Sequence, residues 1–412
     1  MNCWMSLLIL LSVGSHGLAQ DWKSGEDRPV SVPSLASPVA VHTPVNYSPD
    51  QHWPILFHYH TNGMGPNVQL PAYYSNESDF ILVAMIREES DIFLQEEPFW
   101  RNEFAKLVEV RSELVKQGLQ VDVNRTYLGG LGLGGWYASY LADFAMAELA
   151  GVYVMAAGTY TASKLTPKPV RKRMPIYVGV AQLETNYAFA LNATEHFRRL
   201  GAQVTFDEYL GLNHVIPMPP GGPVAERFRQ WLQIEANLKT PEEGRRLVAA
   251  WSEKIDARLA TLEAPMDQFL LIEHVATFPF YAALPAATRA KLKTRREELM
   301  VNPKLRDEML ARREFAKLNH EETLDFAIRN RRRIASNYAS LYQKFPETHY
   351  GARAGLAMIR LRDPVENPDR WMFQSEEQKE RFLEEVKRRP LPSLPQGKLM
   401  LEMERVTEVL SL

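Results

Sequence analysis

The chain has 412 residues, enough for two domains, and its 45% hydrophobic and 24% charged content is ordinary for a globular protein. The formal net charge at pH 7 is -2, so no overall positive field favours nucleic acid or an anionic membrane surface. No nucleic-acid-binding motif is present in the sequence, so we expect no nucleic-acid partner.

The first nineteen residues have the pattern of an export signal. Residues 4–13 are almost wholly apolar, and Gly17 and Ala19 supply small residues before a cleavage point. This run of roughly ten residues is too short to span a bilayer, which takes about twenty. We therefore predict that residues 1–19 are a signal peptide, that the single cysteine Cys3 leaves with it, and that the exported mature chain has no membrane span. No Lys or Arg precedes the apolar run, which leaves an uncleaved anchor or a misassigned start as the alternative.

Strand and helix patterns alternate between residues 40 and 237, after an extended lead-in over residues 20–39 that is rich in Pro, Ser and Val. Apolar runs predict strands at 54–60, 80–86, 151–157, 175–180 and 204–209, and residues 121–136 read as a strand, a sharp glycine turn and the start of a helix. Helical spacing predicts helices at 97–117, 137–149, 187–200 and from 228. This alternation is typical of an α/β domain with a parallel sheet that helices cover on both faces.

Strand patterns stop near residue 238, so residues 238–412 are predicted to form an all-helical C-terminal domain. The helical segments are 241–262, 286–299, 303–318 and 320–345. Residues 334–354 resemble a tetratricopeptide-type hairpin, in which Pro346 ends one helix and Thr348 caps the next. No clean repeat at a fixed period accompanies it. These helices offer a surface for a protein partner.

The most informative motif is the glycine-rich turn at residues 130–134. These residues read Gly-Leu-Gly-Leu-Gly and are followed by Gly135; they occupy the five positions of the nucleophile elbow, Gly-x-Ser-x-Gly. The elbow glycines are therefore Gly130, Gly132, Gly134 and Gly135, and Gly132 stands where the serine would be. Glycine has no side-chain oxygen, so acyl transfer through a serine ester cannot occur at this position. Glycine also relieves the backbone strain of an elbow tip.

Residues 40–235 resemble the α/β-hydrolases of the polyhydroxybutyrate-depolymerase and feruloyl-esterase type. The resemblance rests on Asp122-x-x-Arg125-x-Tyr127 before the glycine turn and on the residues Gly-Leu-Asn-His at 211–214 after the last strand. It implies a doubly wound, mostly parallel α/β-hydrolase sheet. In such enzymes the Asp and Arg stabilise the chain as it enters the elbow strand.

The resemblance also implies roles for two further residues. His214 takes the position of the general base, and an acid after the strand at 175–180 would orient its ring. Glu184 is the only carboxylate in that loop, so it is the candidate acid. The alternatives are a structural histidine at 214 and a surface glutamate at 184.

An oxyanion hole needs backbone N–H groups that point at developing negative charge. One donor would be Leu133, directly after the elbow tip. The second would come from the loop that contains Thr61, Asn62 and Gly63.

Neither a substitute nucleophile nor a metal is evident. Ser139 lies seven positions after Gly132, about two turns into the next helix, too far from the elbow tip. His58 and His60 point to the same side of a strand, but no third ligand accompanies them, so we expect no metal site and no cofactor.

Three functions remain open on these grounds. The first is an exported α/β-hydrolase-fold protein that is inactive as a serine esterase and binds a small ester-, acid- or glycan-like ligand or a protein partner. The second is an active carboxyl-ester hydrolase with a non-standard nucleophile, and the third is a structural envelope protein. Fold alone does not choose among them.

Overall fold

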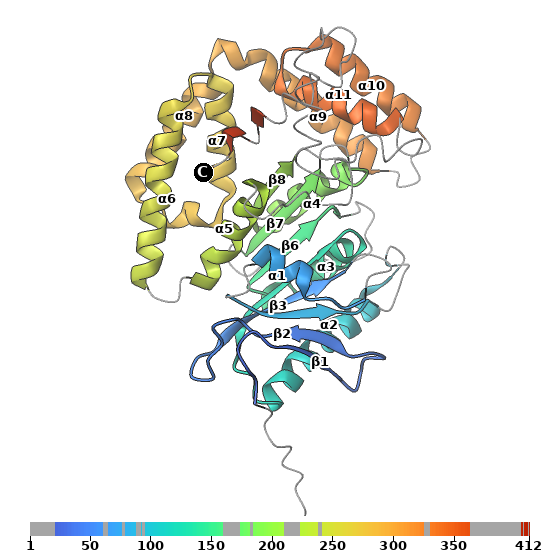
Figure 1. Cartoon of the computed structure of the whole chain (residues 1–412). Coiled ribbons are helices and arrows are strands. Elements are labelled where there is room, and N and C mark those ends of the chain that lie inside the picture. The colour runs from blue at the N-terminus through green and yellow to red at the C-terminus, as the bar shows by residue number, and fades with distance from the viewer. Residues whose placement is uncertain are drawn as a thin grey trace, which may run out of the picture.

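The computed structural model describes residues 21–60, 65–75, 79–87, 92, 95–159, 174–181, 184–209, 223–237, 241–324, 330–362, 405–406, 408–410 and 412. These residues form an eight-stranded sheet with helices on both faces, and a helical assembly arches over one edge of the sheet (Figure 1). The predicted signal peptide at 1–19 lies outside the described residues.

The sheet has the strand order β1-β2-β4-β3-β5-β6-β7-β8. All the pairs from β4 to β8 are parallel, whereas β2 is antiparallel to β1 and to β4. The strands are β1 Asp27–Val30, β2 Val39–His42, β3 Trp53–Tyr59, β4 Ile81–Met85, β5 Val121–Leu131, β6 Gly151–Met155, β7 Pro175–Ala181 and β8 Gln203–Tyr209. The predicted mostly parallel α/β sheet, with helices on both faces, is confirmed.

The sheet begins earlier than the sequence predicts, because β1 lies within the segment 20–39 that reads as a lead-in. Val30, Val32 and Val39 are at most 3% exposed and extend the apolar layer at this edge. A strand of four residues is too short for its alternation to stand out in the sequence.

Helices cover the sheet on both sides. They are α1 Gln69–Ser75, α2 Glu97–Lys116, α3 Leu133–Ala145, α4 Tyr187–Arg199 and α5 Pro223–Asn237. Side chains of α2, α3 and α4 share one hydrophobic cluster with the sheet, and side chains of α1 and α5 share the other. Every residue of β3, β4, β6 and β7 is consequently buried, which explains their continuous apolar runs.

All the regular structure described after residue 240 is helical, as predicted. The helices are α6 Pro241–Thr261, α7 Pro265–Thr277, α8 Ala286–Met300, α9 Arg306–Thr323, α10 Arg331–Lys344 and α11 His349–Arg362. The α10–α11 hairpin has the predicted cap, because the Gly351 N–H donates to Oγ1 of Thr348 at 2.9 Å. Its likeness to tetratricopeptide hairpins stays a prediction. None of the described helices combines the length and apolarity needed to cross a membrane.

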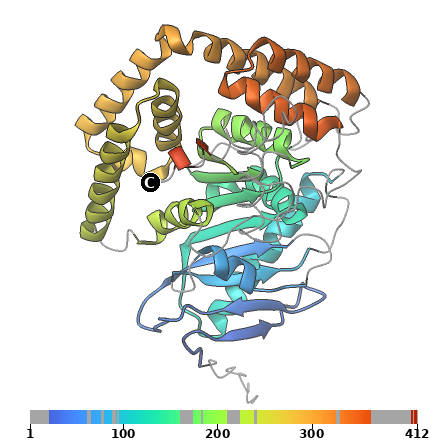
Figure 2. The same ribbon diagram turned by 45° about the horizontal axis from the view of Figure 1, so that its top comes forward.

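The helical assembly packs on the β8 edge of the sheet (Figure 2). There α9 lies against α4, and α7 lies along β8, where Oγ1 of Thr205 donates to the Thr277 carbonyl at 2.8 Å. Both hydrophobic clusters contain residues from before and after position 238. The predicted boundary at 237–238 therefore separates the α/β part of the sequence from the all-helical part, but both hydrophobic clusters extend across it.

Buried charges also join the two halves. Arg353 of α11 binds Glu208 of β8 at 2.6 Å, and the Tyr187 hydroxyl donates to the same carboxylate at 2.7 Å. Deeper in the helical half, Arg360 binds Glu322 with both side chains at most 2% exposed. A buried charge is tolerated only when it is paired and hydrogen-bonded, so each of these contacts fixes the position of two elements.

Removing one member of the Arg353–Glu208 pair should be far more destabilising than removing both. We expect Arg353→Met to lower the free energy of unfolding by about 3–5 kcal/mol, because Glu208 is left charged and buried. Adding Glu208→Gln should recover much of that loss. Arg333→Gln, which breaks an exposed pair with Glu321, should cost less than about 1 kcal/mol. Urea unfolding measures all four proteins, and equal losses for Arg353→Met and Arg333→Gln would contradict the structural role of the pair.

A second polar cluster lies under α5. The Tyr177 hydroxyl and Nε of Arg227 both donate to Asp207, at 2.5 and 3.0 Å. His274 of α7 is buried beside them, and this burial lowers its pKa from 6.5 to about 4, with Asp207 opposing and Arg227 reinforcing the shift. His274 is therefore a neutral imidazole at physiological pH.

This shift predicts a loss of stability in mild acid. Between pH 6.5 and 4 the unfolded chain binds a proton at His274 that the folded chain does not, so stability falls as the pH is lowered. The loss should reach a few kcal/mol and be smaller in His274→Gln than in the parent or in the exposed-site control His320→Gln. Thermal unfolding from pH 7 to 4 tests this, and identical pH profiles for the three proteins would refute it.

Candidate functional site

Gly132 is the single residue between β5 and α3. Its φ is +57°, its N–H donates to the Met155 carbonyl of β6 at 2.8 Å, and its carbonyl accepts from the Trp136 N–H at 3.0 Å. Gly132 therefore lies at a turn between a strand and a helix, as the sequence predicts; its equivalence to a nucleophile position stays a prediction. No side-chain atom projects from this tip.

The other elbow glycines are required by close packing of backbones. A Cβ at Gly134 would lie 2.0 Å from the Tyr59 carbonyl oxygen, and one at Gly130 would lie 2.3 Å from the carbonyl oxygen of Gly134. A Cβ at Gly135 would lie 2.7 Å from the Met155 carbonyl oxygen. The start of α3 thus fits between β3 and β6 only if these positions lack side chains.

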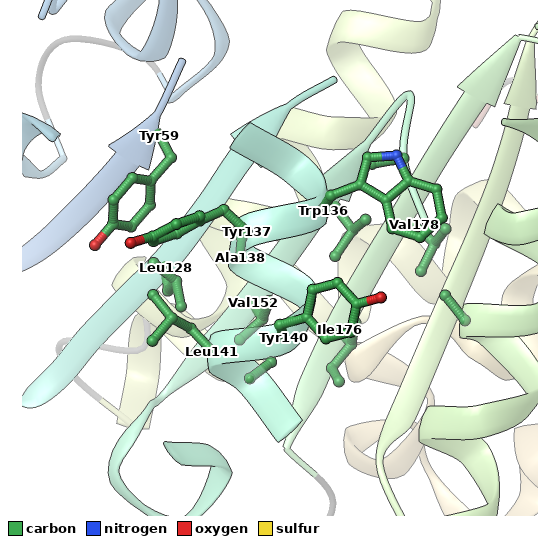
Figure 3. Packing of buried hydrophobic residues seen from close by; sticks show 14 of the residues in the cluster. Tyr59, Leu128, Trp136, Tyr137, Ala138, Tyr140, Leu141, Val152, Ile176 and Val178 are labelled. Atoms are coloured by element: carbon green, nitrogen blue, oxygen red, sulfur yellow. The ribbon is translucent and has the colours of Figure 1, made fainter. Parts of the chain in front are cut away.

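Aromatic residues of α3 pack between this helix and the sheet (Figure 3). Tyr137 packs on Tyr59 with ring centroids 4.6 Å apart, and its hydroxyl donates to Glu103 of α2. Trp136 and Tyr140 lie over the sheet on the same helix. These contacts place the first turns of α3 in the hydrophobic core.

Asp122 and Arg125 form the contact that the resemblance implies. Nε of Arg125 donates to Asp122 at 2.6 Å, and its Nη2 donates to the His52 carbonyl at 2.9 Å. The pair sits in the first residues of β5, where the register with β3 shifts between Trp53 and Ile55. It therefore secures an irregular strand start at the opposite end from the elbow.

Glu184 lies after β7 and is 2% exposed, which rules out the surface-glutamate alternative. Its Oε1 accepts from the Asn186 N–H at 3.3 Å and from the Thr185 hydroxyl at 3.2 Å. Nδ2 of Asn186 donates to the Ala156 carbonyl at 2.9 Å, one residue beyond the Met155 carbonyl that receives the elbow. The loop of Glu184 is thus tied to the strand that binds the tip.

Ala156 itself has a φ of +49°, the one positive φ among described non-glycine residues. Such backbone conformations cost about 1–3 kcal/mol and gather at functional sites. Sequence reasoning missed Ala156 and Asn186, and the only signal was the position of Asn186 in the loop of the candidate acid.

Other parts of the predicted site lie outside the described residues. These are His214 and the loop residues Thr61, Asn62 and Gly63. Leu133 is described and is the first residue of α3, where backbone N–H groups have no acceptor within the helix. Its predicted place as an oxyanion donor is consistent with this position.

His58 and His60 do point to the same face, with ring centroids 4.6 Å apart. Nδ1 of His58 lies 2.5 Å from the Tyr153 hydroxyl, and Nε2 of His60 accepts from the Asn67 N–H at 3.2 Å. Burial lowers the pKa of both rings, and His60 lowers that of His58 further. In the described parts of the chain no three His, Cys, Asp or Glu side chains are grouped to hold a metal.

Ser139 is engaged elsewhere. The Ser139 Oγ lies 2.6 Å from Oγ1 of Thr159, and Ser139, within α3, is only 1% exposed. The turn therefore has the N-terminus of α3 beside it and no hydroxyl at its tip. Gly132 has no side-chain oxygen and so cannot form an acyl-enzyme.

No known family model matches the sequence, and no curated protein matches it either. Solved structures do resemble the fold. A phospholipase/carboxylesterase from Dyadobacter fermentans has 12% identity and a TM-score of 0.37, over 50% of this chain and 97% of that one. A CE1 ferulic acid esterase from Anaeromyces mucronatus has 14% identity and a TM-score of 0.37, over 55% and 95%.

A third match is the acylaminoacyl peptidase of Pyrococcus horikoshii, with 13% identity and a TM-score of 0.40 over 52% of this chain. This chain spans only 42% of that peptidase. Similarities of this size assign neither a substrate nor an activity.

The close packing around Gly134 predicts that alanine substitution destabilises the protein far more at this glycine than at Gly65. Gly134→Ala should lower the free energy of unfolding by at least about 3 kcal/mol, because its Cβ would meet fixed backbone atoms. Gly65→Ala is the matched control, since nothing lies within 4 Å of a Cβ there. Urea unfolding compares the two, and a Gly134→Ala protein as stable as the control would refute the close approach.

Proposed function

We propose that this chain is an exported ligand-binding protein with an esterase-like α/β-hydrolase fold and without serine-esterase activity. One observation carries the proposal: the backbone follows the path of a strand-to-helix elbow, and the residue at its tip is Gly132. The tip supplies no oxygen for attack on a carbonyl, while the N–H groups at the start of α3 still suit an electronegative ligand atom.

The ligand class follows from this chemistry. A small ester, acid or glycan presents oxygen atoms that the Leu133 N–H can bind, and no bond in the ligand needs to break. Export rests on the apolar pattern of residues 4–13. A protein partner on the C-terminal helices is compatible with the same role.

The buried Glu184 favours a second candidate, a carboxyl-ester hydrolase with a non-standard nucleophile. A carboxylate at 2% exposure is costly to bury, and its loop is tied to the elbow through Asn186. In this candidate Glu184 orients His214, which activates water directly.

Hydrolysis of p-nitrophenyl acetate and butyrate by the mature chain separates the two candidates. We expect no burst and no turnover above that of His214→Ala, because acyl transfer lacks its attacking atom. Gly132→Ser should gain slow turnover that the added change His214→Ala abolishes, and Gly132→Ala should gain none. Turnover by the parent that His214→Ala removes would overturn the proposal in favour of the hydrolase.

Binding at the elbow has its own test, a thermal-shift panel of small esters, their acids and oligosaccharides. We expect a ligand from this panel to raise Tm. Leu133→Pro should lower the affinity for that ligand at least about tenfold, because proline removes the backbone N–H. Proline is nevertheless tolerated at the first position of a helix. Leu133→Ala keeps the N–H and should bind normally. Equal affinity in the two variants would contradict binding at the elbow.

A further inference from the structure

A cavity of about 420 Å³ lies where the helical assembly meets the sheet, a size that suits small-molecule sites. Its walls come from both halves of the chain, namely α4 and β8 on one side and α7, α9 and α11 on the other. Gly132, Leu133 and Glu184 do not line it, so it is separate from the elbow.

Positive charge exceeds negative charge on these walls. Arg198, Arg199, Arg312 and Arg353 line the cavity, against Glu195, Glu208 and Glu273. The Glu273 carboxylate is shared between two arginines, because it forms ion pairs with Arg296 and with Arg312. Arg199 has no carboxylate partner among the described residues.

Two of these arginines are held in place before any ligand arrives. Nε and Nη2 of Arg353 bind Glu208 at 3.1 and 2.6 Å, and its guanidinium lies 4.9 Å from the centroid of the Tyr350 ring. Arg312 donates to Glu273 at 3.0 Å and lies 5.9 Å from the same ring. A guanidinium has five N–H donors, so each keeps donors for an anion after binding its glutamate.

Part of the remaining wall is apolar, between polar side chains such as Asn192 and Asn319. Leu191 of α4, Phe206 of β8, Leu270 of α7 and Phe315 of α9 all border the cavity. An inorganic anion would leave these apolar side chains exposed to water, whereas a ligand with an apolar body would cover them. The charge and the apolar wall together select a ligand that is anionic at one end.

We propose that this cavity binds an amphipathic organic anion, a carboxylate joined to an apolar body. Arg312 and Arg353 bind the carboxylate, and the apolar wall receives the body. Because both halves of the chain contribute, the bound anion joins the sheet to the helical assembly and stabilises their contact.

Isothermal titration of the mature chain with 4-phenylbutyrate, decanoate and the neutral 4-phenyl-1-butanol tests the proposal. We expect at least one of the two carboxylates to bind. If 4-phenylbutyrate binds, 4-phenyl-1-butanol should have an affinity at least about tenfold lower, because it carries no charge. Arg312→Gln should weaken carboxylate binding about tenfold. Ala316→Trp keeps every charge, places a large ring at the α9 wall of the cavity and should abolish binding.

The control Arg333→Gln removes an exposed arginine of α10 that does not line the cavity, and it should bind as the parent does. Leu133→Pro should also bind as the parent does, which separates this site from ligand binding at the elbow. Absence of binding by both carboxylates, or binding that survives Ala316→Trp, would overturn the proposal.

Discussion

The arrangement of the site depends on how closely the first turn of α3 approaches the backbone of β3. Only a glycine at 134 allows the Tyr59 carbonyl to lie where a Cβ would be. This approach places Gly132 at the turn, where its N–H donates to the Met155 carbonyl at the end of β6. The geometry of the turn is thus a packing property that does not depend on a side chain at position 132.

A second constraint makes the two halves of the chain one packing unit. Glu208 at the edge strand is buried and must be paired, and its partner Arg353 comes from α11, 145 positions later. The same arginine lines the cavity between the halves. Stability and ligand binding therefore share residues at this junction, and an anion bound there would act on the contact between sheet and helices.

Much of the fold could be predicted from the sequence because its signals are local. Strands buried on both faces read as apolar runs, and the glycines at 130, 132, 134 and 135 marked the elbow. The four-residue β1 and the helix α7 carried no such signal. The pairing of Glu208 with Arg353 could not be predicted either, because it depends on tertiary packing. For the candidate site, the sequence placed Glu184 in the loop after the strand that is β7, but the link from Asn186 to Ala156 depends on a backbone turn that only the structure reveals.

The most direct test of the central claim is intact mass spectrometry of the mature chain after incubation with a fluorophosphonate. Such a reagent adds covalently to an activated serine and needs no knowledge of the substrate. The account predicts no adduct on the parent protein and a single adduct on Gly132→Ser. A stoichiometric adduct on a serine of the parent, lost in His214→Ala, would contradict it.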